Sequence, residues 1–384
     1  MHGFPGSGKS TTISHLVKQL VQRGKTILIS CYTHAAVDNI LCKLLDHNIR
    51  ILRVSTHSRV DSRLKHYTIE GMSISTVEEF EKMYSNVQVV GVTCLSVKQS
   101  LFSVKKFDYC IIDEASQISF PVCIAAIKNA KRFVLIGDHH QLSPLVKSKE
   151  AGDLGFNQSL FEILLQKHPN ACVKLTRQYR MNKSLMNISN SFVYENQMIC
   201  GNDAVSDRQI KLKAVKCSSC YTDCWIERVL DPEKAFLFLD IDHLEFVAES
   251  SVRNQIEADL IGKLVFHLVE RGIESDNIVL LTPYRAQVDL ICNFGVESHT
   301  IDRFQGKDSE IILISCVKTS SSSSGDLLDN WRRMNVAFTR ARSKMIIVGS
   351  RRGVEEHDPM KRFISLCESV DSIYQISKQQ FSHP

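Results

Sequence analysis

The chain opens on Met1-His2-Gly3-Phe4-Pro5-Gly6-Ser7-Gly8-Lys9-Ser10-Thr11, in which Gly3 and Gly8 have the spacing of a phosphate-binding loop that Lys9 and Ser10 complete. Such a loop turns backbone N–H groups inward around phosphates, in conformations with positive φ that a Cβ obstructs. The pattern predicts nucleoside triphosphate binding, with Gly3, Gly6 and Gly8 shaping the backbone. Lys9 then reaches the β and γ phosphates and Ser10 gives its hydroxyl to Mg²⁺. A helix beginning near Thr11 points its positive end at the same anion.

Length and composition set the broad class. The 384 residues are enough for two domains of ordinary size, and a net charge of +5 favours a phosphate-bearing partner only weakly. No apolar run of the sequence is long enough to span a bilayer, so no membrane partner is expected. Cys94, Cys110 and Cys316 lie in apolar runs, which indicates reduced, buried thiols of an intracellular protein. Only Met1 and His2 are left of the strand that normally enters such a loop, so we expect a piece of a longer protein.

Short apolar runs of strand length alternate with helical periodicity along almost the whole chain. The predicted strands are residues 26–31, 87–93, 107–112, 132–136, 235–239, 277–281, 309–316 and 344–348. This alternation is typical of α/β folds with doubly wound parallel sheets, which hold ligands at the carboxyl ends of their strands. We predict two such domains, at residues 1–172 and 173–384. The polar, basic segment at about 46–76 is expected to be a small subdomain or loop inserted in the first.

Two carboxylates directly follow the apolar run at 109–112, at the tip of a predicted buried strand. Asp113 suits a role in holding Mg²⁺. Glu114 is placed to orient and deprotonate the water that attacks the γ phosphate. A pair of solvated acids after a strand is the less favoured interpretation of this run alone, and the upstream phosphate loop makes it weaker still.

A second turn has the same layout, because the run at 133–136 leads into Gly137-Asp138-His139-His140-Gln141-Leu142-Ser143-Pro144. Gln141 can hydrogen-bond the attacking water or the γ phosphate. The neighbouring His139 and His140 do not indicate a metal site, since adjacent residues on a loop are expected to point apart and no further ligand is evident nearby.

Two arginine-rich runs, at 175–181 and 335–342, occur in the second half. An arginine is always charged and forks onto phosphate oxygens, so Arg180 and Arg340 can stabilise the charge that develops on a transferred phosphoryl group. Either arginine taken alone is better explained as a partner in a surface salt bridge.

Taken together, these motifs resemble those of superfamily 1 helicases. The resemblance rests on the phosphate loop and on residues 113–117, 137–144, 178–181, 282–287, 302–306 and 336–342, in the family's order. The sequences of the motifs are most similar to those of one branch of this superfamily. That branch contains the nonsense-mediated-decay RNA helicase and the eukaryotic replication helicase/nucleases that process Okazaki flaps. Residues 32–39 and 113–118 are most similar to the helicase part of the latter.

The resemblance implies a P-loop NTPase with two RecA-like domains that uses ATP and Mg²⁺. It implies phosphate and metal contacts for Gly8, Lys9, Ser10 and Thr11, a Mg²⁺ ligand in Asp113 and a catalytic base in Glu114. It also implies γ-phosphate contacts for Gln141, Arg180 and Arg340, base stacking by Tyr179, and a position near the ribose for Asp308. The residues that it aligns with contacts to single-stranded nucleic acid are Thr33, His34, Thr93, Pro283 and Tyr284.

Two features of the family are not found in this sequence. The adenine-reading glutamine and the nuclease domain with its iron–sulfur cluster would both lie upstream of the phosphate loop, so no cluster and no nuclease activity are expected within the chain. Cys217, Cys220 and Cys224, with Cys200 or His243 as a fourth ligand, form a candidate metal set. Free thiols in a variable insertion are the favoured interpretation, because no paired C-x-x-C accompanies them.

The sequence therefore predicts an ATP-dependent helicase that moves on single-stranded DNA in replication and repair, in the nucleus and with the mitochondrion as a second site. An RNA helicase of the same branch is an alternative, because the family grips mostly the backbone of the strand. A truncated nucleic-acid-binding fragment with weak catalysis is a second alternative. Partner proteins in replication or repair are suggested by the resemblance alone.

Overall fold

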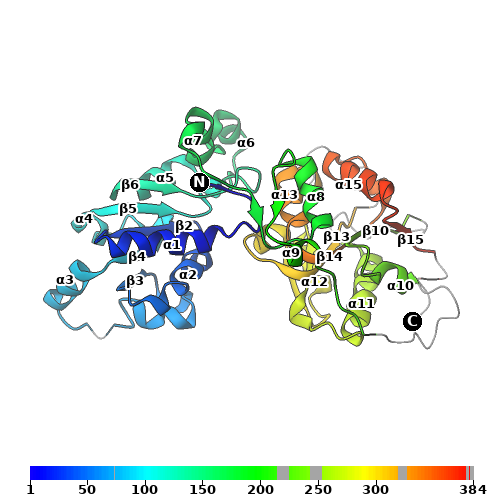
Figure 1. Cartoon of the computed structure of the whole chain (residues 1–384), viewed down its shortest axis with the longest axis horizontal. Helices are drawn as coiled ribbons and strands as arrows, with labels where there is room; N and C mark the ends of the chain where they lie inside the picture. The colour runs from blue at the N-terminus through cyan, green and yellow to red at the C-terminus, as the bar shows by residue number, and fades with distance from the viewer. Residues whose placement is uncertain (73, 214–224, 243–252, 319–326, 378–379, 381–384) are drawn as a thin grey trace. The chain divides into compact units, whose positions relative to one another are not determined.

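The structure, a computed structural model, describes residues 1–72, 74–213, 225–242, 253–318, 327–377 and 380 (Figure 1). The chain divides into two compact units, Met1–Thr176 and Arg177–Pro384. The sequence places this boundary slightly earlier, after residue 172. The difference arises because β7 (Lys174–Leu175) pairs in parallel with β1 (His2–Gly3), which ties this short strand to the first unit.

The first unit contains a parallel sheet of order β3-β4-β2-β5-β6. Its strands are β3 (Ile51–Val54), β4 (Val89–Thr93), β2 (Ile27–Cys31), β5 (Phe107–Ile112) and β6 (Ala130–Leu135). A parallel bridge between His2 and Gly137 places β1 beside the end of β6. All of these strands point the same way, so their carboxyl ends lie at one edge of the sheet.

Helices cover both faces of this sheet (Figure 1). They are α1 (Lys9–Gln22), α2 (His34–Cys42), α3 (Val77–Asn86), α4 (Leu101–Val104), α5 (Phe120–Ile127), α6 (Lys149–Ala151) and α7 (Leu160–Lys167). In β2, Ile27 and Ile29 pack with α1 and α2, whereas Leu28 packs on the opposite side with the core that α3, α5 and α7 complete. Because successive side chains alternate between the faces, a strand covered on both sides is apolar throughout.

The sequence predicts that the segment at 46–76 is inserted in the first domain, but part of it belongs to the main sheet. Residues Ile51–Val54 form the edge strand β3 and pair in parallel with β4. Short 3₁₀ turns follow at His57–Arg59 and Ser62–Tyr67. Leu52 and Val54 are buried in the sheet core, so part of this basic segment belongs to the main fold.

The second unit contains a parallel sheet of order β12-β11-β13-β14-β10-β15. Its strands are β12 (Glu297–Thr300), β11 (Ile278–Thr282), β13 (Ser309–Ser315), β14 (Ala341–Gly349), β10 (Phe236–Asp240) and β15 (Ile373–Gln375), and β8 (Arg177–Gln178) pairs separately with β9 (Ile199–Cys200). The helices are α8 (Lys183–Phe192), α9 (Asp203–Ser206), α10 (Trp225–Leu230), α11 (Gln255–Glu270), α12 (Arg285–Ile291), α13 (Trp331–Phe338), α14 (Arg351–Val354) and α15 (Asp358–Ser369).

These two parallel sheets confirm the predicted α/β fold class. The eight strands predicted from sequence are all present, with ends shifted by a few residues. Cys94, Cys110 and Cys316 are buried and outside any disulfide, as expected. Among the helices that the structure describes, none has the length and apolar character needed to cross a membrane.

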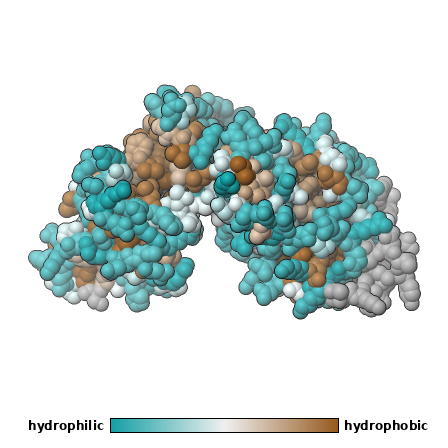
Figure 2. All heavy atoms as spheres, viewed as in Figure 1, coloured by the Kyte–Doolittle hydropathy of each residue, from teal (hydrophilic) through white to brown (hydrophobic). Residues whose placement is uncertain are grey.

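Apolar side chains are exposed on one part of the first unit, near α5 and α7 (Figure 2). A pocket of about 320 Å³ lies there and is lined by Phe120, Pro121, Leu154, Gly155, Phe156, Gln158 and Ile163. Leu154 is 83% exposed. The carboxyl ends of the strands, by contrast, carry the charged and polar groups that the sequence analysis singles out.

Candidate nucleotide site and nucleic-acid interface

The phosphate loop connects β1 to α1, and two of its glycines have left-handed backbones. Gly6 has φ 70° and Gly8 has φ 78°. A Cβ on Gly3 would lie 2.4 Å from Cγ of Lys9, so only glycine fits beside the lysine stem. No side chain caps α1, and its first-turn N–H groups are the donors that such a loop offers to phosphate.

Lys9 and Thr11 both have hydrogen-bond partners within the first unit. The Lys9 Nζ donates to the Gly3 carbonyl at 3.0 Å, and Lys43 Nζ donates to Thr11 Oγ1 at 3.2 Å. Ser10 is the second residue of α1, beside both. The structure therefore brings the predicted phosphate contacts together in one turn, with two ammonium groups beside it.

Asp113 is buried at the end of β5 and accepts a hydrogen bond from the Glu114 N–H at 2.9 Å. Burial raises the pKa of the Asp113 carboxyl, and the charge of Glu114 raises it further, while Lys9 acts in the opposite direction. A nearby cation would stabilise the charged form of this buried carboxylate, which is consistent with a role of Asp113 as a Mg²⁺ ligand.

Glu114 has a left-handed backbone, with φ 51° and ψ 38°. A non-glycine residue in this region is strained, and such strain is often found at active sites. Gln117 Nε2 donates to Glu114 Oε2 at 3.3 Å. The side chain is half-buried directly after the end of β5, where it stays accessible to a water, as a general base requires.

Asp138 organises the loop after β6, a role that the sequence analysis missed. Its fully buried carboxylate accepts from the His140 N–H at 3.1 Å and from Gln141 Nε2 at 2.9 Å. Because a carboxylate can only accept, the amide nitrogen of Gln141 must face it. Gln141 Oε1 is then the atom that can accept a hydrogen bond from a water.

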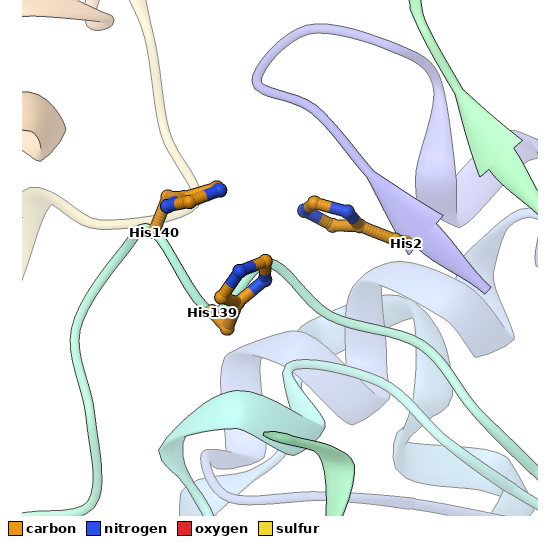
Figure 3. Close-up of side chains that lie close together, drawn as sticks. All are labelled: His2, His139 and His140. Atoms are coloured by element: carbon orange, nitrogen blue, oxygen red, sulfur yellow. The ribbon is translucent and has the colours of Figure 1, made fainter. Parts of the chain in front are cut away.

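The expectation that His139 and His140 point apart is wrong (Figure 3). Their ring centroids lie 3.9 Å apart, and the ring of His2 lies 4.7 Å from that of His139. The third imidazole comes from β1, which the fold places beside the end of β6.

In the second unit, Asp308 joins the predicted arginines. Arg180 Nη2 lies 3.0 Å from Asp308 Oδ1, and Arg342 Nε lies 2.5 Å from Asp308 Oδ2. Burial by itself raises the pKa of Asp308, but Arg180 and Arg342 outweigh it and hold that pKa below its usual value. Arg340 lies close enough to add to this effect.

Arg340 is only 1% exposed. It donates to the carbonyls of Val336 at 2.8 Å and Lys307 at 3.1 Å, and to Thr339 Oγ1 at 2.7 Å. Arg180, Arg340 and Asp308 therefore form one cluster, in which the guanidinium of Arg340 is fixed by its own unit. Their nucleotide contacts remain a prediction.

Tyr179 projects from a turn that Gln178 holds in place. The fully buried Gln178 side chain accepts from the N–H groups of Arg180 at 2.9 Å and Met181 at 2.8 Å. The Tyr179 ring is 53% exposed and packs on Gly201, where a Cβ would lie 2.2 Å from Tyr179 Cε1. One ring face is thus backed by glycine, which leaves a surface on which a base can stack.

Gly201→Ala is expected to weaken ATP binding by displacing the Tyr179 ring, while the phosphate loop is unchanged. Stacking on an aromatic ring contributes about 1–3 kcal/mol, so the loss should approach that of Tyr179→Ala. Titration with a fluorescent ATP analogue measures it. Gly152→Ala is the matched control, since the nearest atom to its added Cβ is 3.7 Å away. Unchanged affinity in both Gly201→Ala and Tyr179→Ala would remove Tyr179 from the nucleotide site.

Three predicted nucleic-acid residues lie at neighbouring strand ends of the first unit. Thr33 is exposed after β2 and accepts from the Ala36 N–H as the N-cap of α2. His34 Nδ1 lies 3.1 Å from Arg53 Nη2, and burial together with Arg53 lowers the pKa of His34. Thr93 ends β4 and is buried. Because arginine only donates, Nδ1 of His34 is the acceptor and Nε2 carries the proton, ready to donate.

Asp38→Ala is expected to destabilise the first unit by about 3–5 kcal/mol, because it leaves the Arg53 charge buried without its partner. Arg53 is fully buried, and its Nε donates to Asp38 Oδ1 at 2.6 Å. Urea unfolding measures the change. Arg362→Ala, which removes an exposed ion pair with Asp358, is the control and should have little effect. Equal stability of Asp38→Ala and its parent would contradict a structural role for this pair.

Pro283 and Tyr284 follow β11 in the second unit, and both are buried. Tyr284 is 8% exposed, and Lys318 Nζ lies 5.9 Å from its ring centroid. Little of the ring is open for stacking on a base. Lys318, which the sequence analysis did not select, brings a cation to the same position.

A buried polar network next to Lys318 was also missed. Val317 has φ 68°, an outlier for a β-branched residue. Glu257 Oε2 accepts from the Val317 N–H at 2.9 Å and from Ser315 Oγ at 2.6 Å, and Asn254 Nδ2 donates to the Val317 carbonyl at 3.3 Å. The network fixes the strained residue that precedes Lys318. No sequence motif marks these residues, since their partners lie far apart along the chain.

Burial raises the pKa of Glu257 to about 8. The folded chain therefore binds this proton more tightly than the unfolded chain, and the stability that it contributes falls as pH rises from the ordinary pKa of 4.5 to about 8. Glu257→Gln should flatten this decline. Urea unfolding at both ends of that pH window tests it, with Asp289→Asn on α12 as the exposed control. An unchanged pH slope in Glu257→Gln would assign the titration to another group.

Cys217, Cys220, Cys224 and His243 lie outside the described residues. Cys200, the other candidate ligand, is half-buried and contacts Gln178 and Met186.

Parts of the chain are similar to known proteins in sequence and in fold. Two family models described as AAA domain match the chain, one over residues 156–352 and one over residues 1–81 and 71–149. An arterivirus nonstructural protein 10 helicase aligns with 93% of this chain and 60% of its own at 16% identity, with a TM-score of 0.48.

Curated relatives match over nearly the whole chain. DNA replication ATP-dependent helicase/nuclease JHS1 of Arabidopsis thaliana is 40% identical over 91% of this chain and 27% of its own length. The DNA2 proteins of Xenopus laevis and Homo sapiens, which carry the same description, are 38% and 37% identical over 99% and 98% of this chain. The chain spans 38% of the length of either one. The chain therefore belongs to the AAA-domain family of P-loop NTPases, and the predicted resemblance to the helicase part of the replication helicase/nucleases is confirmed.

Proposed function

We propose that this chain is the motor of an ATP-dependent DNA helicase that moves along single-stranded DNA. The observation that carries the proposal is the strand-end cluster of the first unit, where the phosphate loop, Asp113, Glu114 and Gln141 meet at one edge of a parallel sheet. Relatives of 35–40% identity are described as DNA replication ATP-dependent helicase/nucleases, which supports this choice over other P-loop hydrolases.

The residues of the first unit support a direct hydrolysis. Ser10 and Asp113 would hold Mg²⁺, which neutralises charge on the β and γ phosphates when bound. The Lys9 ammonium would exchange its hydrogen bond to the Gly3 carbonyl for contacts with the β and γ phosphates. Glu114 takes a proton from the water whose oxygen attacks the γ phosphorus, Gln141 Oε1 orients that water, and the bond to the β-phosphate oxygen breaks to release ADP and phosphate.

The protein would bind single-stranded nucleic acid mainly through the sugar-phosphate backbone. Thr33 and His34 offer hydroxyl and imidazole donors at the end of β2, and Lys318 offers a cation beside Tyr284. Such contacts tolerate any base sequence. The names of the relatives favour DNA as the substrate and replication as the process. Repair, Okazaki flap processing, end resection, and a location in the nucleus with the mitochondrion as a second site follow only from the family resemblance of the sequence motifs.

The test is ATP turnover by the purified chain with single-stranded DNA and with RNA of equal length, together with separation of a labelled duplex. Stimulation by DNA above RNA, with strand separation, is the expected result. Equal or greater stimulation by RNA would instead assign the chain to the RNA helicases of the same branch. ATP-independent strand binding without turnover would identify a nucleic-acid-binding fragment.

A further inference from the structure

Three imidazole rings converge next to the phosphate loop (Figure 3). His2 comes from β1, and His139 and His140 come from the loop after β6. One nitrogen of each ring lies within 4.8 Å of the others, and the three centroids are 3.9 to 5.8 Å apart. His2 is buried, whereas the other two rings are half-buried at the surface of the loop.

A carboxylate orients the buried member of this group. His2 Nε2 lies 3.1 Å from Asp138 Oδ1, and Asp138 is fully buried. Because a carboxylate only accepts, Nε2 of the neutral His2 ring carries the proton that it shares with Asp138, and the lone pair is on Nδ1. The same carboxylate accepts from the His140 N–H. A carboxylate that fixes the tautomer of a histidine in this way is typical of metal centres.

We propose that His2, His139 and His140 form a binding site for a late first-row divalent cation, with Zn²⁺ as the preferred ion and water as the fourth ligand. Imidazole nitrogens suit Zn²⁺, Ni²⁺ and Cu²⁺, whereas Mg²⁺ takes oxygen ligands. The site is therefore distinct from the Mg²⁺ position at Ser10 and Asp113. Tetrahedral Zn²⁺ places its nitrogens about 3.3 Å apart, so a bound ion would draw together the three nitrogens, which lie within 4.8 Å of one another.

A bound cation would connect the loop at residues 137–141 to β1. Gln141 directly follows His140, and its side chain donates to the Asp138 that also contacts His2. Zn²⁺ would therefore restrict the residue predicted to orient the attacking water, and ATP turnover should change when the site is filled. This effect on turnover rests on the proposed function, whereas the binding of the cation does not.

The binding test uses the untagged chain, first stripped with a chelator and assayed without nucleotide. Zn²⁺ is added, free ion is removed by dialysis, and bound ion is counted by mass spectrometry for the parent, for His139→Asn/His140→Asn, and for Cys217→Ser/Cys220→Ser/Cys224→Ser. The histidine variant should bind one Zn²⁺ fewer than the parent, whereas the cysteine variant should keep the ion held by the histidines. Because the histidine variant retains His2 and the chain terminus, chelation there alone cannot explain a loss.

Two further readouts identify the ligands. Co²⁺ in the site should show the visible bands of a tetrahedral ion in the cysteine variant, without sulfur charge-transfer absorption. Asp138→Asn should weaken Zn²⁺ binding about 10–100-fold, as loss of an orienting carboxylate does elsewhere, with the urea midpoint in chelator confirming that each variant is folded. Zn²⁺ binding that is unchanged in the histidine variant, or lost only in the cysteine variant, would overturn the site. Neither result would bear on the ATPase proposal.

Discussion

Glu114→Gln is expected to reduce ATP turnover stimulated by single-stranded DNA by about 10²–10⁴-fold, the usual contribution of a general base, while ATP and strand binding are kept. The amide has the shape of the carboxylate but cannot take the proton of the attacking water. Its Oε1 can still accept from Gln117, as Glu114 Oε2 does at 3.3 Å. The left-handed backbone at φ 51° is equally strained for either residue, so the fold should be unaffected.

The measurement combines turnover under saturating strand with the affinity for ATP. Glu81→Gln, on the exposed face of α3, is the matched control for loss of one negative charge and should turn over at the parent rate. If Glu114→Gln also retained the parent rate, another residue would be the base. Weaker ATP binding with no effect on the maximal rate would instead mean that Glu114 acts through the metal position of Asp113.

The sheets were predictable because their central strands are apolar on both faces. β2 and β11, and most of β5 and β13, are buried between helix layers and therefore appear as mainly apolar runs. The edge strand β12 is Glu297-Ser298-His299-Thr300, a polar sequence that has no such signal. β3 was hidden because the surrounding segment is polar and basic, although its own residues are buried.

Individual motifs of the site were predictable because their residues are consecutive and sit at strand ends. Contacts between motifs were not. Asp138 and His2 lie 136 positions apart, and Arg180 reaches the carbonyl of Thr339 over 159 positions. The three-histidine cluster needed the pairing of β1 with the end of β6, which no local pattern encodes.

Buried polar groups were the least predictable part. The Glu257 carboxylate has the sequence context of any amphipathic helix, yet it lies inside the second unit and holds the strained Val317. Likewise, Arg53 belongs to a basic run whose composition predicts exposure to solvent, but its guanidinium is fully buried against Asp38. A charged residue is buried only where a specific partner meets it, and that partner is known only from the fold.

Arg340→Ala is expected to lower the kcat for ATP by about 10³-fold or more, as loss of an arginine finger does in other P-loop hydrolases, with a much smaller change in ATP affinity. The charge would act on the γ phosphate mainly in the transition state. The packing of Arg340 adds a second effect, because alanine removes the donor to the Lys307 carbonyl, whereas the Val336 carbonyl keeps its hydrogen bonds from Thr339. Such a loss costs about 1–3 kcal/mol, so urea unfolding must accompany the kinetics.

Two companion variants separate catalysis from packing. Arg340→Lys keeps the positive charge but lacks the planar guanidinium with its several N–H donors. Compared with Arg340→Ala, it should therefore restore more of the stability than of the kcat. Arg180→Ala should resemble Arg340→Ala in kcat, whereas Arg342→Ala, which loses a partly exposed pair with the same Asp308, should not. If all three alanine variants show equal, mild losses of kcat that follow their losses of stability, the arginines serve only to build the cluster around Asp308. The γ phosphate would then be stabilised by the first unit alone, and the role of the second unit in hydrolysis would have to be assigned to other residues.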